Sequence, residues 1–331
     1  MTIVGKPFLR IASPEALPEE LRGGVVAIGN FDGVHRGHQA VLGEALTSAE
    51  KLGRPALVLT FEPHPRAFFR PAEAPGRITP APLKARLMAA LGFDAIIEQD
   101  FTAEFASRTA ESFIADLLGG QLGARTVVTG YDFHFGKGRL GTPAMLAAAG
   151  GKHGFGVSQV APFSDEGGNV ISSSAIRGLL LNGEIGTAAG LMGWRPAFAG
   201  IIERGRQLGR TIGYPTANMR LPDNVPLNEG IYAVKFRRAN GALLDGVASF
   251  GRRPTVTENG EPLLETFLFD FSGDLYGEDC TVSVVSRLRG EEKFDGLAPL
   301  VAQMKRDETE ARAVLSALQP LSPLDAAITF A

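Results

Sequence analysis

Residues 29–38, with the sequence GNFDGVHRGH, place three glycines and two histidines at one predicted strand-to-helix junction. The uninterrupted apolar run at 25–28 predicts a buried strand, and the apolar spacing of 39–46 predicts a helix. Free N–H groups and the helix dipole make the start of a helix favourable for an anion. The chain is therefore expected to contain an α/β unit with a phosphate-binding turn.

The residue types in this segment suit contact with a phosphate. Gly33 and Gly37 have no side chains that would hold a phosphate away from the backbone. His35 and His38 can reach it with N–H donors, and with positive charge when they are protonated. No HExxH pattern or third clustered ligand accompanies the two histidines, so a metal site is the weaker interpretation.

Composition excludes several classes of protein. With Lys+Arg 33 against Asp+Glu 36, the net charge of −3 argues against a general nucleic-acid or membrane-surface binder. The single cysteine, Cys280, permits neither an internal disulfide nor a cysteine-based metal site. The N-terminus lacks a signal-peptide pattern and no apolar run approaches about 18 residues, so we expect a cytoplasmic protein with no membrane partner. The sequence leaves open whether it forms a homo-oligomer.

Strands and helices alternate through the first half of the chain. This pattern predicts a parallel sheet with helices on both faces and ligands at the carboxyl ends of the strands. The further strands are expected at 55–61, 95–98, 125–129 and 156–160, and the further helices at 82–91, 103–118 and 143–150.

A serine cluster at 171–174 opens another predicted helix and allows two interpretations. Serines before an apolar-periodic run are typical N-caps, and taken alone the cap is favoured. The other interpretation is a second anion site, in which Ser172 and Ser173 contribute hydroxyls and Arg177 binds phosphate oxygens.

The pattern changes after residue 196 to several short strands separated by turns. Asn240 and Gly241 between two apolar runs give a strong hairpin signal, and the whole pattern favours an antiparallel barrel. Helices are expected at 294–305 and 308–318. We therefore expect two domains, residues 1–182 and 197–331, joined by a linker at 183–196.

Several motifs occur in the order found in one enzyme family. The 29–38 segment resembles its GxFDGxHxGH signature, ISSSAIR at 171–177 its ISSTxIR motif, and GYPTAN at 213–218 its GxPTAN motif. The chain thus resembles the bacterial bifunctional riboflavin kinases/FAD synthetases over roughly residues 15–310. The resemblance implies a Rossmann-like nucleotidyltransferase domain and a β-barrel kinase domain, which together convert riboflavin to FMN and then FMN to FAD.

For the adenylyl transfer, the resemblance implies that His35, His38 and Arg177 are catalytic and that no general base is needed. It implies ATP or phosphate contacts by Gly29, Asn30, Phe31, Gly33, Gly37, Ser172 and Ser173. The TFxPHP-like element implies that Phe61, His64 and Pro65 line the flavin side, and the loop after residue 130 adds Asp132. A lone proline-flanked turn is more often structural.

For the kinase reaction, Glu265 matches the family's catalytic glutamate, which would take the proton of the ribityl hydroxyl. Thr216 and Asn218 offer hard oxygen ligands for Mg²⁺ on ATP, and a flap containing Gly209 and Gly213 would close over the phosphates. Phe267 stands where the family commonly has histidine, and Ser249 where asparagine is common.

Two other functions remain open from the sequence. The first is a nucleotidyltransferase with a single activity, which GYPTAN and Glu265 argue against. The second is a flavin-binding regulatory protein with a decayed kinase site, which Phe267 keeps open. Incubation with riboflavin and MgATP distinguishes them through the flavins that form.

Overall fold

The computed structural model describes residues 7–205, 209, 213–253 and 260–331 of the chain. Its internal contacts divide the chain into two compact units. The first comprises Met1–Pro75 and Thr79–Ser172, and the second comprises Gly76–Ile78 and Ser173–Ala331. The short segment Gly76–Ile78 therefore packs with the second unit although it lies within the first half of the sequence.

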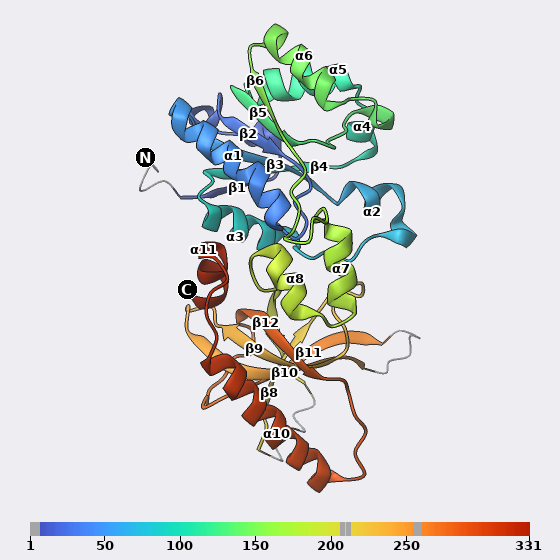
Figure 1. Cartoon of the computed structure of the whole chain (residues 1–331), viewed down its shortest axis with the longest axis vertical. Helices are drawn as coiled ribbons and strands as arrows, with labels where there is room; N and C mark the ends of the chain where they lie inside the picture. The colour runs from blue at the N-terminus through green and yellow to red at the C-terminus, as the bar shows by residue number, and fades with distance from the viewer. Residues whose placement is uncertain (1–6, 206–208, 210–212, 254–259) are drawn as a thin grey trace. The chain divides into compact units, whose positions relative to one another are not determined.

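The first unit contains a six-stranded sheet in the order β1-β4-β3-β2-β5-β6, with every neighbouring pair parallel (Figure 1). The strand order reverses between β2 and β5, and such a switch point opens a crevice at the carboxyl ends of the strands. The strands are β1 Leu9–Ile11, β2 Val25–Ile28, β3 Ala56–Glu62, β4 Ala95–Asp100, β5 Thr126–Gly130 and β6 Gly156–Val160.

Helices cover this sheet because alternate strand residues point to opposite faces. The π-helix Phe113–Gln121 packs with one face in a large apolar cluster, whereas α1 contacts β2 and β5 through buried residues outside that cluster. The α-helices are α1 Arg36–Leu52, α2 Pro65–Phe69, α3 Ala81–Leu91, α4 Ala103–Ala106, α5 Ala110–Ser112 and α6 Pro143–His153. Short 3₁₀ turns occur at Pro14–Ala16, Glu19–Leu21, Pro71–Glu73 and Lys137–Arg139.

The expectation of one continuous helix over 103–118 was wrong. The chain breaks after α4, and Thr109 caps α5 by accepting a hydrogen bond from the Ser112 N–H at 3.1 Å. A threonine side chain competes for backbone N–H groups in this way and favours a new helix start.

The second unit is built around a closed antiparallel barrel in the order β10-β11-β8-β7-β12-β9, so the predicted parallel sheet and antiparallel barrel are both confirmed. Its strands are β7 Ala197–Glu203, β8 Thr216–Arg220, β9 Gly230–Arg237, β10 Leu243–Arg253, β11 Glu261–Leu268 and β12 Asp279–Arg289. Its helices are α7 Ser173–Leu181, α8 Ile185–Met192, α10 Leu297–Ser316, α11 Pro323–Asp325 and the π-helix Ala326–Phe330.

The two helices expected at 294–305 and 308–318 form the single helix α10. Its buried residues Asp307, Ala311 and Leu315 recur at four-residue spacing, so one face continues across the expected break. Ala311 and Leu315 pack against Ala233 and Val285 of the barrel.

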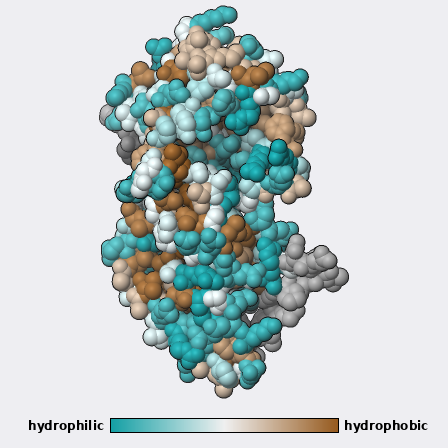
Figure 2. Space-filling view, turned by 45° about the vertical axis from the view of Figure 1, so that its right-hand side comes forward, coloured by the Kyte–Doolittle hydropathy of each residue, from teal (hydrophilic) through white to brown (hydrophobic). Residues whose placement is uncertain are grey.

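The surface mixes polar and apolar side chains. On the face drawn in Figure 2, hydrophilic and hydrophobic residues are interspersed. Exposed large apolar residues include Phe69, Leu140 and Leu297. Across the part of the chain that the structure describes, none of the helices is long and apolar enough to cross a membrane.

Candidate active sites

The 29–38 loop follows β2 and has an unusual backbone. Phe31 has φ 48°, Gly33 has φ 90° and Val34 has φ 38°. A left-handed conformation is unfavourable for a β-branched residue such as valine, so the surrounding structure must hold it in place. Val34 is completely buried, and its carbonyl accepts a hydrogen bond from Gln39 Nε2 at 2.7 Å. The loop is therefore a strained turn fixed by its packing, as expected of a preorganised binding site.

Thr79 stabilises this loop through two hydrogen bonds. Its backbone N–H donates to Asp32 Oδ1 at 2.9 Å, and its hydroxyl oxygen accepts from the Gly33 N–H at 2.8 Å. Both Asp32 and Thr79 are buried. The aspartate of the motif thus stabilises the turn itself.

His35 and His38 lie together at the start of α1. His35 is the N-cap, and its Nδ1 accepts a hydrogen bond from the His38 N–H at 3.2 Å. An accepting Nδ1 carries no proton, so neutral His35 has its proton on Nε2. The two rings stack with centroids 3.6 Å apart. Burial, then the charges of His35 and Lys84, lower the pKa of His38 well below its ordinary value of 6.5. At neutral pH His38 is therefore a neutral imidazole, which carries one N–H group that can donate.

Two glycines of the loop have little room for a side chain, and its asparagine has a buried acceptor atom. A side chain at Gly29 would lie 2.9 Å from the Phe31 ring, and one at Gly37 would lie 3.2 Å from the His35 ring. Asn30 has a buried Oδ1 without a hydrogen-bond partner among the described residues. Such an atom is available to a bound donor.

The residues predicted to bind flavin have different environments. Phe61 is buried and packs against Phe101 and Phe105 in the core. His64 caps α2, where its Nδ1 accepts from the Arg66 N–H at 3.1 Å, and Pro65 is the first residue of that helix.

Asp132 is exposed just beyond the carboxyl end of β5. Since β2 and β5 are neighbours in register, with Ile28 opposite Thr129, Asp132 and the 29–38 loop follow adjacent strand ends. In parallel sheets of this kind, ligands bind at this edge, beside the switch point between β2 and β5.

Lys84 is a polar residue at this edge that the sequence analysis missed. Its side chain is fully buried, and Nζ donates to Thr60 Oγ1 at 3.0 Å and to Glu62 Oε1 at 2.9 Å. The only signal in the sequence was a lysine on the apolar face of the helix predicted at 82–91.

The serine cluster lies where the first unit ends. Ser172 is the last residue of the first unit, and Ser173 begins α7 in the second unit. Arg177 follows one turn later, and its Nε donates to the Gly76 carbonyl at 2.7 Å.

The barrel brings Thr216, Asn218 and Glu265 together on one face. Glu265 of β11 lies directly opposite Asn218 of β8, and Phe267 lies opposite Thr216. Side chains of directly opposed residues in an antiparallel pair are neighbours on the same face. Asn218 is buried, and its Nδ2 donates to the Thr216 carbonyl at 3.1 Å, which directs the amide oxygen the other way.

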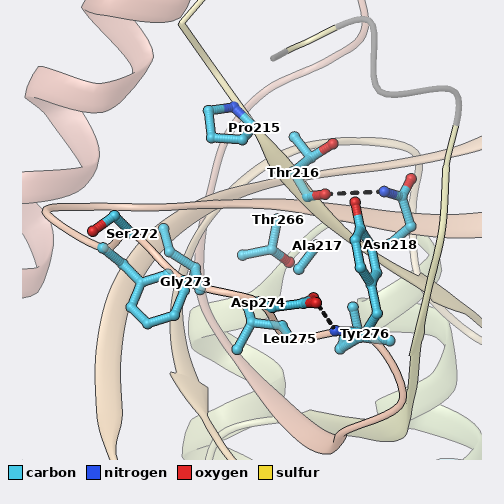
Figure 3. A pocket seen from close by; sticks show the side chains of 13 residues that line it. Pro215, Thr216, Ala217, Asn218, Thr266, Ser272, Gly273, Asp274, Leu275 and Tyr276 are labelled. Carbon is cyan, nitrogen blue, oxygen red and sulfur yellow. Dashed lines mark hydrogen bonds between the residues drawn. The ribbon is translucent and has the colours of Figure 1, made fainter.

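A pocket of about 260 Å³ adjoins this face (Figure 3). Tyr276 lines this pocket together with Thr216 and Asn218, and Figure 3 shows the hydrogen bond that joins the latter two. Asp274 fixes the local turn because its Oδ1 accepts from the Tyr276 N–H at 3.0 Å. The guanidinium of Arg204 lies 5.0 Å from the centre of the Tyr276 ring, so a cation flanks the pocket. Arg204 lies outside the motifs that the sequence displays.

The glycines predicted to form a flap are only partly described, since residues 206–208 and 210–212 lie outside the described residues. Gly209 accepts a hydrogen bond from the Tyr214 N–H at 2.8 Å, and a side chain there would lie 2.2 Å from the Tyr214 carbonyl oxygen. Gly213 has φ 87°, which favours glycine.

The two departures from the family pattern lie next to this face. Ser249 is directly opposite Glu265 on β10. Phe267 packs on Tyr214 with ring centroids 4.7 Å apart. At the position where the family commonly has histidine, this chain thus has a phenylalanine ring that packs on Tyr214.

Comparison with known proteins gives consistent results for the two halves of the sequence. A family model described as FAD synthetase matches residues 17–175, and one described as riboflavin kinase matches residues 192–315. The chain is 40% identical to the bifunctional riboflavin kinase/FMN adenylyltransferase of Escherichia coli strain K12, covering 92% of this chain and 96% of that protein. It is 37% identical to the Bacillus subtilis protein of the same name, again covering 92% and 96%.

A solved structure has a similar fold. It is described as a macrolide-efflux protein from Streptococcus pneumoniae, with a TM-score of 0.78 and 33% sequence identity, and the match covers 92% of this chain and 98% of that chain. A shared fold does not by itself imply a shared activity, so the macrolide-efflux description applies to that structure and not to this chain.

Proposed function

This chain belongs to the family of bifunctional riboflavin kinases/FMN adenylyltransferases, and we propose how its residues divide the two reactions between its two halves. The protein phosphorylates riboflavin to FMN with ATP and transfers an adenylyl group from ATP to FMN, giving FAD. We assign adenylyl transfer to residues 1–182 and phosphorylation to residues 197–331, joined by 183–196. The limits of the two family-model matches support this division.

The adenylyl transfer is assigned to the 29–38 loop and α1. The phosphate of FMN attacks the α-phosphorus of ATP, an oxygen–phosphorus bond forms, and pyrophosphate leaves with the electron pair of the broken bond. Negative charge accumulates on the α-phosphate, so positioned donors matter most. His35 and His38 would donate N–H groups to it, and the capping bond at 3.2 Å, which leaves the proton of neutral His35 on Nε2, supports this role. The attacking group is already anionic, so no base is assigned.

The remaining contacts of this reaction follow from the same chemistry. Ser172, Ser173 and Arg177 would hold the leaving β- and γ-phosphates, because hydroxyls, helix N–H groups and guanidinium all bind phosphate. Phe61, His64, Pro65 and Asp132 would line the flavin side, with Phe61 acting from the core rather than by direct stacking, since its ring is buried.

The phosphorylation is assigned to the barrel face of Glu265. The terminal hydroxyl of riboflavin's ribityl chain is neutral, so a carboxylate that takes its proton aids the attack on the γ-phosphorus, and ADP leaves. The observation that best supports this is the register that sets Glu265 directly opposite Asn218. The pocket bounded by Thr216 and Tyr276 would hold the nucleotide.

Mg²⁺ is proposed as the cofactor of both reactions. In the kinase half, the Thr216 hydroxyl and the Asn218 amide oxygen would hold it, and the hydrogen bond that fixes the Asn218 amide fits this use. When bound, the metal would neutralise charge on the phosphates of ATP. Gly209 and Gly213 would let the flap approach the same phosphates.

We further propose that the protein works in the cytoplasm on small molecules, not on nucleic acid or at a membrane. The near balance of 33 basic and 36 acidic residues supports this.

Two substitutions test the division of labour. Glu265→Gln is expected to lower FMN formation about 10²- to 10⁴-fold, the range for loss of a general base, while FAD formation from supplied FMN persists. His38→Ala is expected to lower FAD formation about 10²-fold or more and to leave FMN formation intact. Chromatography of the flavins formed from riboflavin or FMN with MgATP measures both rates.

Glu261→Gln is the matched control for Glu265. Glu261 lies on the same strand but pairs at the surface with Arg220, 2.6 Å away, so neither rate should change. Normal FMN formation by Glu265→Gln would refute the assigned base, and normal FAD formation by His38→Ala would refute the assigned donor.

A further inference from the structure

Lys84 occupies a position that packing alone does not explain. It lies in α3, where the neighbouring buried residues Leu83, Leu87 and Met88 are apolar, and its own side chain has no exposed surface. Removing an ammonium group from water is costly, and a hydrophobic residue of similar size often serves stability as well as a buried ion pair does. A buried lysine beside a binding loop therefore calls for a functional explanation.

The contacts of Lys84 lead directly to the 29–38 loop. Lys84 Nζ donates to Thr60 Oγ1 at 3.0 Å, and the Thr60 hydroxyl in turn donates to the Asn30 carbonyl at 3.3 Å. The second acceptor of Lys84 is Glu62 Oε1, at 2.9 Å, on the same strand. The direction of donation along this chain is fixed, because an ammonium group can only donate.

A backbone as strained as that of this loop needs such support. Phe31 and Val34 both have positive φ, a strained conformation for residues other than glycine that persists only where the surrounding structure holds it. Asn30 adjoins the first of these residues. The Lys84–Thr60 contact holds Asn30, while Thr79 holds Asp32 and Gly33 through separate hydrogen bonds.

We propose that Lys84 is a positioning residue for adenylyl transfer, which through Thr60 holds the 29–38 loop and its histidines in the conformation that receives the α-phosphate of ATP. The inference rests on the assignment of adenylyl transfer to this loop. The same ammonium group is close enough to His38 to contribute to the lowered pKa of that histidine, after burial and His35.

The test is Lys84→Met, which keeps the length and apolar packing of the side chain but removes its hydrogen bonds. We expect kcat for FAD formation from FMN to fall about 10-fold or more, since small displacements of reacting groups have effects of this size. KM for FMN should change far less. FMN formation, which is assigned to the second unit, should be unchanged, and the remaining FAD formation with a near-normal KM for FMN shows that the first unit is folded. In an imidazole NMR titration, the pKa of His38 should rise.

Asp94→Ala is the matched control. Asp94 Oδ2 accepts from the Ala56 N–H at 2.8 Å, so this variant also loses a hydrogen bond to β3, but at the amino end of the strand. FAD formation should be unchanged in Asp94→Ala. An equal loss in Asp94→Ala and Lys84→Met would overturn the inference, because any weakening of the sheet would then suffice.

The double variant Lys84→Met/Glu62→Gln separates positioning from a stranded charge. In the single variant Glu62 loses its cation, and this alone could disturb the site. If FAD formation stays low in the double variant, positioning by Lys84 is supported; if it returns to the wild-type rate, the inference is overturned. His38→Ala identifies a failure of the underlying assignment: if His38→Ala is also fully active, the loop is not the site, whereas activity in Lys84→Met alone overturns only the present inference.

Discussion

Asp325 near the C-terminus should be decisive for the stability of the second unit. Its side chain is completely buried and forms an ion pair with Arg195, which is only 7% exposed. Asp325 Oδ1 also accepts from the Arg195 N–H at 3.0 Å and from the Thr329 hydroxyl at 3.0 Å. The Leu321 N–H donates to Oδ2 at 2.9 Å. One carboxylate therefore joins the last segment of the chain to the residues that enter the barrel.

Asp325→Ala would leave Arg195 as a buried charge without its carboxylate. Breaking a buried pair from one side costs about 3–5 kcal/mol, whereas the whole free energy of unfolding of a domain is about 5–15 kcal/mol. For a unit of this size each kcal/mol lowers Tm by about 2–4 °C, so the expected decrease is about 6–20 °C.

Calorimetry and activity after heating measure this effect together. After a heat step at a temperature between the Tm of Asp325→Ala and that of the wild-type protein, Asp325→Ala should have lost FMN formation, whereas the wild-type protein should retain it. Arg195→Met/Asp325→Leu should recover much of the stability, because removing both charges strands neither. Glu261→Ala, which breaks only an exposed pair with Arg220, should cost less than about 1 kcal/mol. A loss below about 1 kcal/mol in Asp325→Ala would refute the reasoning.

Three further outcomes are expected. Gly205→Ala should lower kcat for FMN formation about 10-fold without affecting FAD formation, because its side chain would lie 2.7 Å from the Asn218 amide. An NMR titration should show that His38 stays neutral well below pH 6.5. Because the unfolded chain then binds a proton that the folded chain does not, the free energy of unfolding should decrease as pH falls below 6.5. His38→Gln should lack this decrease. Phe267→His should retain FMN formation but lower the free energy of unfolding by about 1 kcal/mol, because it weakens the ring contact with Tyr214; denaturant titration tests this, and unchanged stability would contradict it.

Local patterns explain why much of the fold was predictable. The apolar run at 25–28 became the buried strand β2, and Asn240 and Gly241 connect the paired strands β9 and β10. Both signals act over a few residues. The prediction of one helix over 103–118 was wrong because the apolar spacing continues across a break, where the single cap residue Thr109 starts a new helix.

The candidate sites divide in a similar way. Sequence alone identified the histidines of the 29–38 loop, because their neighbours in the chain already define a strand end and a helix start. It could not supply the conformation of Val34, whose positive φ is held by packing and hydrogen bonds. Nor could it show that a lysine in a predicted helix would donate to Thr60.

The sequence by itself determined the alternation of strands and helices, the strand-to-helix turn at 29–38 and the order of the motifs, because each depends on neighbouring residues. Only the tertiary structure decided that Glu265 lies opposite Asn218 and that Arg195 pairs with Asp325. Strand register and burial bring together residues that are far apart in the chain. Those long-range choices depend on how every element packs at once, and no local pattern encodes them.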